Sequence, residues 1–198
     1  MNRKLIKPSI VLGVLFSLVA IVAACSKLFA ISPADSEKLN AGFSDVEVPL
    51  EVGQVVPEYQ ATNSDGDKVR LSDVTDEQPA LLLFYRGDWC PFCMDQLDGI
   101  KAVLPEIQEQ GVQVIAVSPD DVATTENTRR QFGQGFLFWS DKETENMSQF
   151  GIDREDGLPH PSVFLIAKGG KLVWFYASED YKQRPTGEQL LQVIKSKL

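Results

Sequence analysis

Cys90 and Cys93 are the residues whose types and spacing point most directly to chemistry. They belong to the stretch Trp89-Cys90-Pro91-Phe92-Cys93, which follows an apolar run over residues 80–85 and a polar turn over residues 86–88. A buried strand that ends in a turn and presents a C-x-x-C pair at the start of a helix is typical of redox proteins. The sequence therefore predicts a redox-active cysteine pair.

The two cysteines are expected to differ in role. At a helix N-terminus, unpaired N–H groups and the helix dipole would lower the pKa of the Cys90 thiol below its free value of about 8.5. Because the thiolate is the reactive species, Cys90 would attack a substrate disulfide, and the deeper Cys93 would resolve the mixed disulfide. Trp89 would cover the pair and offer an apolar docking surface.

Three other interpretations of the pair are a structural disulfide, half of a metal site, and two inert core thiols. Zinc normally takes four ligands, whereas the chain has a single histidine, His160, and no second C-x-x-C. A disulfide that closes two residues constrains the unfolded chain little, so it would stabilise the fold only weakly. Redox function is favoured, with no metal and no cofactor beyond the Cys90–Cys93 disulfide.

The composition is that of a globular protein with one substantial domain. The chain has 198 residues, of which 43% are hydrophobic and 24% charged, and its formal net charge is −9. An acidic chain without a basic stripe after the N-terminus argues against nucleic-acid binding, because phosphate contacts need clustered Lys and Arg.

The N-terminal segment has the pattern of an export signal. Residues 1–9 carry Arg3, Lys4 and Lys7 without an acid, and residues 10–24 are uncharged. A basic start, a short apolar core and small residues at its end are typical of a secretory signal. A membrane-spanning helix needs about 20 apolar residues, so this core is short for one.

Cys25 ends this signal in Val22-Ala23-Ala24-Cys25-Ser26, which resembles a bacterial lipobox. The resemblance implies that residues 1–24 are a lipoprotein signal peptide, that Cys25 is lipidated, and that residues 25–45 tether the domain to the membrane. Ser26 resembles the sorting pattern for the outer membrane of a two-membrane bacterium. The alternatives are an ordinary signal cleaved after Ala24 with a free Cys25, or an uncleaved anchor.

From residue 46 onward, strands and helices alternate. The hydrophobic spacing and turn residues predict β-hairpins at 59–62 with 68–71 and at 163–166 with 172–176, and single strands at 80–85, 112–117 and 136–139. Helices are predicted after Cys93, with a kink near Pro105, then from the turn at 118–120 to about 132, at 143–150 and at 185–197. This order predicts the α/β class, as a three-layer sandwich with a central mixed sheet flanked by helices.

Residues 46–198 resemble the thioredoxin-like superfamily, and within it the peroxiredoxin-like (AhpC/TSA, redoxin) branch. The resemblance rests on V-G-Q-V-V-P-E-Y-Q-A-T-N-S-D-G near the start, on V-I-A-V-S-P-D-D, and on F-W-S-D, which occur in the family's order. It implies a thioredoxin-like fold and thiol chemistry.

Peroxiredoxins carry a P-x-x-x-T-x-x-C motif whose last residue is the peroxidatic cysteine. Placed on this sequence, Cys93 takes the peroxidatic position, Cys90 replaces the threonine, and Arg86 replaces the proline. The family's second arginine would fall near Pro161, where it is absent. The resemblance therefore implies an incomplete peroxide-binding set.

The thioredoxin motif W-C-x-x-C is intact in Trp89–Cys93. Pro161-Ser162-Val163-Phe164-Leu165 resembles the cis-proline loop that faces the cysteines in thioredoxins. This resemblance implies a cis His160–Pro161 bond, with the backbone of His160 pairing with substrate or positioning the thiolate. The alternative is a trans proline at the start of a strand, since cis X–Pro bonds are a small minority.

Three other side chains near the motif have two interpretations each. The His160 side chain could act as a base toward Cys90, but a packed or surface histidine is favoured. Arg86 and Asp88 would tune the thiolate in opposite directions, or they are solvated turn residues.

The sequence predicts an envelope thiol–disulfide oxidoreductase that uses Cys90 and Cys93. The alternative is a peroxiredoxin-like thiol peroxidase that reduces hydrogen or organic peroxides, and a third interpretation is a binding module with a vestigial pair. The expected partners are a protein disulfide or peroxide substrate, a thiol electron donor, and the membrane through the lipid on Cys25.

Overall fold

The computed structural model describes residue 39, residues 41–144 and residues 146–198. The predicted signal peptide 1–24, the predicted lipidation site Cys25 and most of the predicted tether lie outside the described residues. Within the described part of the chain, no helix is both long enough and apolar enough to cross a membrane.

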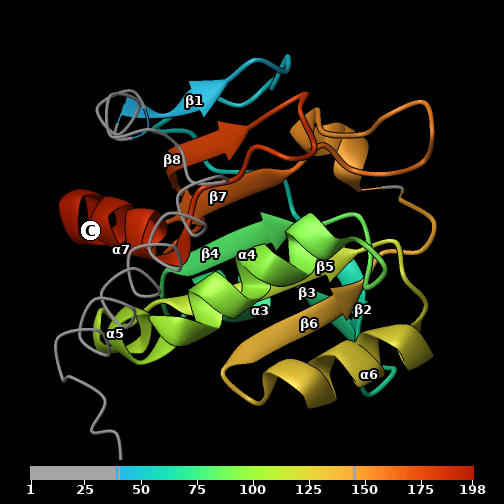
Figure 1. Cartoon of the computed structure of the whole chain (residues 1–198). Coiled ribbons are helices and arrows are strands. Elements are labelled where there is room, and N and C mark those ends of the chain that lie inside the picture. The colour runs from blue at the N-terminus through green and yellow to red at the C-terminus, as the bar shows by residue number, and fades with distance from the viewer. Residues whose placement is uncertain (1–38, 40, 145) are drawn as a thin grey trace, which may run out of the picture. The chain divides into compact units, whose positions relative to one another are not determined.

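Eight strands of the described chain form one sheet in the order β1-β8-β7-β4-β5-β6-β2-β3 (Figure 1). Their bounds are β1 Phe43–Ser44, β2 Gln60–Asn63, β3 Lys68–Arg70, β4 Ala80–Phe84, β5 Gln113–Ser118, β6 Phe136–Ser140, β7 Ser162–Ile166 and β8 Leu172–Ala177. β4, β5 and β6 run parallel, whereas β7 is antiparallel to both β4 and β8. The α/β class with a mixed central sheet is confirmed.

Helices connect the parallel strands and close the chain. They are α3 Ser72–Thr75, α4 Pro91–Ala102, α5 Leu104–Glu109, α6 Val122–Phe132, the 3-10 helix η2 Met147–Phe150 and α7 Gly187–Lys197. Parallel neighbours need a crossover connection, and α4 with α5 and then α6 supply it between β4, β5 and β6.

Both faces of β4 are buried, which explains its uninterrupted apolar sequence. Leu81 and Leu83 face a core that α4, α5, α6 and α7 cover, whereas Leu82 and Phe84 face a second core. Alternate residues of a strand point to opposite faces, so a strand covered on both sides must be apolar throughout. On the second face the cover comes from α3, η2 and loop residues such as Tyr59 rather than from long helices.

The predicted kink at Pro105 is a break between two helices. α4 ends at Ala102, Val103 leaves the helical conformation with φ −111° and ψ 10°, and α5 begins at Leu104. Proline has no N–H to donate to the preceding turn, and its ring crowds the carbonyl four residues earlier, so a new helix starts here.

Part of the predicted tether packs on the domain. We expected no strand over residues 26–45, but β1 pairs in parallel with β8, Phe43 opposite Tyr176. Before β1 in the chain, Leu39 is buried, and its carbonyl accepts a hydrogen bond from the Trp174 indole at 2.6 Å. The ring contact of Phe43 with Tyr176 adds apolar burial that the short strand lacks by itself.

α4 and α7 approach each other backbone to backbone at Gly99 and Gly187. A Cβ atom added at Gly187 would overlap the Gly99 carbonyl and lie 2.9 Å from the backbone nitrogen of Ile100. A Cβ atom added at Gly99 would meet only the Gly187 nitrogen, at 3.6 Å, which is ordinary contact. The absence of a side chain at Gly187 therefore sets how closely α7 lies on α4.

Replacing Gly187 with Ala should destabilise the protein by about 1–3 kcal/mol. The added Cβ atom would overlap backbone atoms of α4, which cannot move away as a flexible side chain could. Urea unfolding measures the change in the free energy of unfolding. Gly99→Ala is the matched control and should be neutral or stabilising by up to about 1 kcal/mol, since Ala is favoured over Gly inside a helix. Equal losses in both variants would contradict this account of the packing.

Candidate active site

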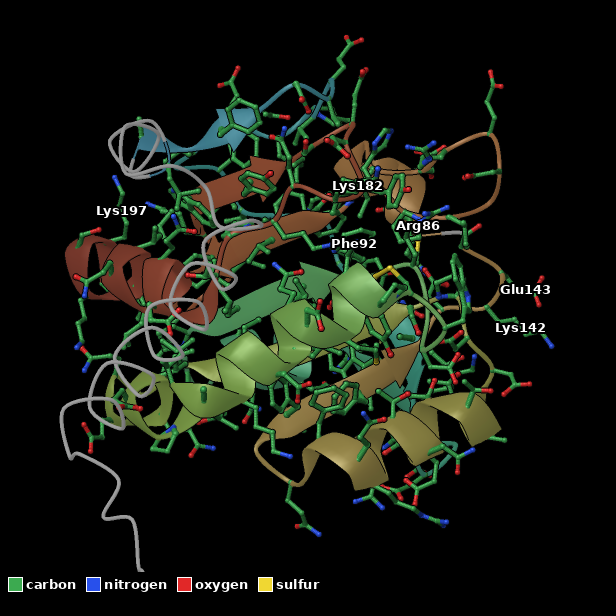
Figure 2. The ribbon with its side chains drawn as sticks, in the orientation of Figure 1. Arg86, Phe92, Lys142, Glu143, Lys182 and Lys197 are labelled. Carbon is green, nitrogen blue, oxygen red and sulfur yellow. A yellow bond between two sulfur atoms is a disulfide. The ribbon has the colours of Figure 1, made fainter. Side chains whose placement is uncertain are left out.

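Cys90 and Cys93 form a disulfide at the N-terminal end of α4, with their Cα atoms 5.3 Å apart. β4 delivers the chain to this point, and Cys90 is the N-cap residue in an extended conformation. Pro91 takes the first helical position, where its fixed φ suits the helix and its missing N–H costs nothing. Figure 2 shows the disulfide as a yellow bond at this end of α4, with the labelled Arg86 and Phe92 nearby.

The turn before the disulfide is tied to the end of β5. The Asp120 carboxylate accepts hydrogen bonds from the backbone N–H of Asp88 at 3.0 Å and from the Ser118 hydroxyl at 2.9 Å. The Cys90 N–H donates to the Gly87 carbonyl at 3.2 Å, and Gly87 has a φ of +144° that disfavours other residues. Burial raises the pKa of Asp120, with smaller contributions from the neighbouring acids Asp88 and Asp121.

Exposure does not separate the two cysteines. Cys90 is 1% exposed and Cys93 is 0% exposed, whereas we expected Cys93 to lie clearly deeper. The Trp89 side chain, by contrast, is 56% exposed beside them. Its proposed use as a docking surface stays a prediction. The two sulfur atoms can still differ in their position on α4, where Cys90 is the N-cap and Cys93 lies in the first turn, and in their neighbours.

Arg184 contacts Cys93. Its Nη2 donates to the Cys93 sulfur at 3.2 Å, and its Nη1 donates to Gln96 Oε1 at the same distance. The Gln96 amide in turn donates to the Pro185 carbonyl at 3.2 Å. Arg184 is 5% exposed, and burial lowers the pKa of its guanidinium to about 10. A buried cation therefore sits on the sulfur of Cys93.

Arg86, predicted as a supporting residue, joins two loops above the pair. Its guanidinium lies 5.2 Å from the centre of the Trp89 ring and 4.9 Å from the centre of the Tyr181 ring. Asp156 lies 3.8 Å away as a loose ion-pair partner, and Arg86 Nε is buried without a hydrogen-bond partner. Tyr181 also packs edge-on against Phe92, so Arg86 links the turn before α4 to the loop before α7.

The structure does not have the cis-proline loop that we expected at residues 160–161. No peptide bond in the described residues is cis, so the His160–Pro161 bond is trans. Pro161 is buried at the start of β7, where its carbonyl accepts from the Ser178 N–H at 3.1 Å. The pairing of β7 with β8 begins at the next residue, Ser162 opposite Ala177.

The backbone of His160 is already paired inside the protein. Its N–H donates to the Ile152 carbonyl at 2.7 Å, and its carbonyl accepts from the Ser162 hydroxyl at 2.8 Å. The N–H is therefore already paired within the domain, and the expected role of the His160 backbone toward substrate or the thiolate stays a prediction. The ring is half-buried with Nδ1 at 3.2 Å from the Ser178 carbonyl, as expected for a packed histidine.

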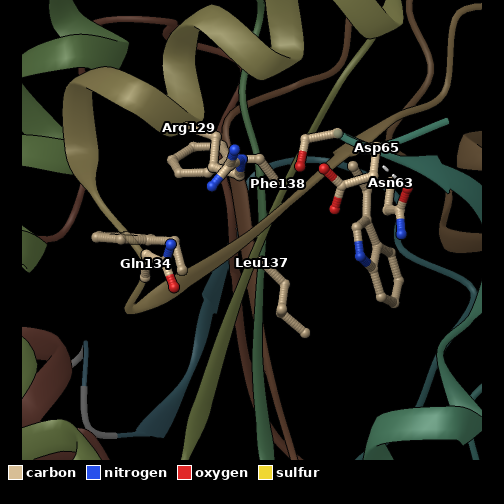
Figure 3. A pocket seen from close by; sticks show the side chains of 9 residues that line it. Asn63, Asp65, Arg129, Gln134, Leu137 and Phe138 are labelled. Carbon is tan, nitrogen blue, oxygen red and sulfur yellow. Dashed lines mark hydrogen bonds between the residues drawn. The ribbon is translucent and has the colours of Figure 1, made fainter.

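Elsewhere in the described chain, a pocket of about 180 Å³ lies between α6 and β6 (Figure 3). It forms because β2 pairs with β6 only at its last residues, which leaves the edge at residues 136–138 unpaired. Its arginine, Arg129, forms an ion pair with Glu126. No cysteine lines it, and within the described residues no group of three or more His, Cys, Asp or Glu side chains could hold a metal ion.

Arg184 is the site residue that sequence reasoning missed. The expected position for a second arginine was near Pro161, but the guanidinium arrives from a loop 91 residues after Cys93. The available signal was its place just before Thr186, the N-cap of α7, where Thr186 and Gln189 form a capping box. The capping box locates the start of α7 but does not indicate which helix α7 packs against.

Comparison with known proteins agrees with this geometry. The chain is 28% identical over 169 residues to the thiol-disulfide oxidoreductase ResA of Bacillus cereus, covering 85% of this chain and 91% of that protein. It is 26% identical over 155 residues to the peroxiredoxin Bcp of Escherichia coli, covering 74% and 97%. Both relatives are oxidoreductases, the class that the cysteine pair predicts.

Solved structures show the same fold. A peroxiredoxin-like protein from Aquifex aeolicus superposes with a TM-score of 0.67 at 20% identity, covering 77% of this chain and 91% of that one. The peroxidoxin BcpB from Mycobacterium tuberculosis gives 0.66 at 20% identity, covering 74% and 97%. The model of the AhpC/TSA family matches residues 52–175, a span that includes the disulfide. The chain belongs to the AhpC/TSA family.

Proposed function

We propose that the protein is a thiol–disulfide oxidoreductase that acts through Cys90 and Cys93. The observation that carries this proposal is the disulfide between them at the N-terminus of α4. Both sulfur atoms of one redox couple lie within a single turn of chain, so a mixed disulfide on one can be resolved at once by the other. The similarity to ResA of Bacillus cereus supports this proposal.

The exchange proceeds in two steps. The Cys90 thiolate attacks one sulfur of a substrate disulfide, and the other substrate sulfur leaves as a thiolate. The Cys93 thiolate then attacks the Cys90 sulfur, which closes the Cys90–Cys93 bond and releases the second substrate thiolate. The substrate has gained two electrons, and a thiol donor must return two electrons to the protein. Run backwards, the same steps oxidise a substrate dithiol.

The proposed location is the bacterial cell envelope, with the protein exported and held by lipid on Cys25. The basic start, the uncharged residues 10–24 and the small residues before Cys25 support this location. Disulfides persist in that oxidising compartment, so turnover as a reductase would need an electron donor that reaches across or along the membrane.

Insulin reduction tests the exchange. The reduced full chain should precipitate insulin chains in the presence of a thiol donor, and Cys90→Ser should abolish this activity because no mixed disulfide can form. Cys93→Ser should trap the mixed disulfide with substrate, which is visible by mass spectrometry. Insulin reduction that persists at the wild-type rate in Cys90→Ser would rule out the proposed mechanism.

A thiol peroxidase is the second candidate, and the Arg184 contact with Cys93 favours it specifically. Cys93 occupies the position that the peroxiredoxin motif assigns to the peroxidatic cysteine. Its thiolate would attack one peroxide oxygen, break the O–O bond and become a sulfenic acid while water or an alcohol leaves. The Cys90 thiol would then displace water from that sulfur and close the disulfide.

Peroxide kinetics distinguish the two candidates. A peroxidase predicts oxidation of the dithiol by hydrogen peroxide far faster than oxidation of free cysteine, and a sulfenic acid trapped on Cys93 in the Cys90→Ser variant. Stopped-flow tryptophan fluorescence follows the first, and dimedone labelling with mass spectrometry locates the second. A rate equal to that of free cysteine leaves disulfide exchange as the function.

A further inference from the structure

The guanidinium of Arg184 is buried beside the disulfide without a carboxylate partner. Its donors go to the Cys93 sulfur, to Gln96 Oε1 and, through Nε, to the Tyr181 carbonyl at 3.2 Å. All three acceptors are uncharged in the disulfide form, and no ion pair joins Arg184 to a carboxylate of the described chain. Burying a cation in this way is costly unless an anion compensates it.

The neighbouring groups do not compensate the charge of Arg184. Arg86 lies close enough to lower the pKa of Arg184 further after burial has done so. The nearby hydroxyls of Tyr176 and Tyr85 supply no anion near neutral pH, because burial raises the pKa of Tyr176 to about 12 and also raises that of Tyr85. The side chain is held by Gln96 and by the loop carbonyl, so it stays on the sulfur.

Reduction of the disulfide supplies the missing anion. When the S–S bond accepts two electrons, the sulfur of Cys93 is already within hydrogen-bond reach of Nη2, where a thiolate would gain a charge-assisted bond. No such cation contacts the Cys90 sulfur among the hydrogen bonds of the described residues; the turn before Cys90 is held instead by the Asp88 N–H, which donates to the Asp120 carboxylate at the end of β5. The contact with Arg184 therefore favours a thiolate on Cys93 in the resting reduced form.

We propose that Arg184 is a positioning residue that stabilises the Cys93 thiolate, and thereby makes the Cys90–Cys93 couple a stronger acceptor of electrons from substrate dithiols than it would be without this contact. This inference rests on the proposed disulfide exchange and says which way Arg184 shifts its equilibrium. In each turnover a dithiol and the protein disulfide give a substrate disulfide, a Cys90 thiol, a Cys93 thiolate and one proton. A couple whose reduced form is stabilised is the more oxidising one.

The pH dependence has a definite sign. Below the pKa of Cys93 both sulfur atoms are protonated on reduction, so Arg184 gives the reduced form no advantage. Above that pKa the thiolate gains its bond to Arg184, and the advantage grows with pH until it levels off above the pKa that Cys93 would have without Arg184. Of the titratable groups on the surrounding elements, Arg184 contacts the Cys93 sulfur, and the others are Arg86, Tyr85, Tyr176, Tyr181, Asp88, Asp120 and, beside Arg86, Asp156.

The test compares Arg184→Met with Arg184→Lys in the full chain carrying Cys25→Ser, so that Cys90 and Cys93 are the only thiols. Equilibration with glutathione over a range of pH gives the equilibrium constant of reduction. At a pH above the Cys93 pKa of both forms, Arg184→Met should disfavour the reduced form by about tenfold, about 30 mV for a two-electron couple, and Arg184→Lys should recover most of that loss. The difference should vanish at acidic pH.

Thiolate absorbance at 240 nm gives a second readout. In a Cys90→Ser background, the pKa of Cys93 should rise by about one unit in Arg184→Met, which is the same tenfold change. Arg86→Met is the matched control, since Arg86 is also a cation in the site but donates no hydrogen bond to either sulfur among those found in the described chain. It should shift the equilibrium less than threefold.

Two results would overturn the inference: an unchanged equilibrium constant in folded Arg184→Met, or equal shifts in Arg184→Met and Arg86→Met. If Arg184→Met does not fold, the pKa of Cys93 in Arg184→Lys decides, because a displaced cation should still hold it below that of a free thiol. Failure of the wild-type disulfide to exchange with glutathione at all would instead count against the proposed function.

Discussion

The close approach of α4 and α7 at Gly99 and Gly187 is the contact on which the site depends. α4 carries the disulfide at its N-terminus, and the loop that enters α7 carries Arg184. The two helices can bring a guanidinium onto the Cys93 sulfur because a glycine at 187 lets the backbones touch. Gln96 then links the two elements by accepting from Arg184 and donating to the Pro185 carbonyl.

The sheet provides the other half of the arrangement. β4 is covered on both faces, so its exit point is held rigidly, and the Asp120 carboxylate at the end of β5 holds the turn that follows. The result is a disulfide with a buried cation on the sulfur of Cys93 only, among the hydrogen bonds of the described residues. This asymmetry, rather than any difference in exposure, distinguishes the two sulfur atoms.

That asymmetry bears on both candidate functions. In disulfide exchange, a stabilised Cys93 thiolate is a ready resolving nucleophile in one direction and a good leaving group in the other. In peroxide reduction, the same thiolate would be the attacking group. The two kinds of relative, a thiol-disulfide oxidoreductase and a peroxiredoxin, show that the AhpC/TSA fold is compatible with either chemistry.

The sequence by itself determined the fold class, the position of the cysteine pair and its redox character. These follow from local signals, since the continuous apolar run of β4, the C-x-x-C spacing and the helical period after Cys93 each lie within a few turns of chain. The break at Pro105 was equally readable, because a proline acts on the turn that precedes it.

Only the tertiary structure decided what surrounds the sulfur atoms. Arg184 is 91 residues from Cys93, and its role depends on which helix α7 packs against, which no local pattern encodes. The trans bond at Pro161 and the pairing of the His160 N–H with the Ile152 carbonyl likewise became visible only in the folded chain. Local pattern specifies elements and reactive residues, whereas long-range packing sets the charges that those residues experience.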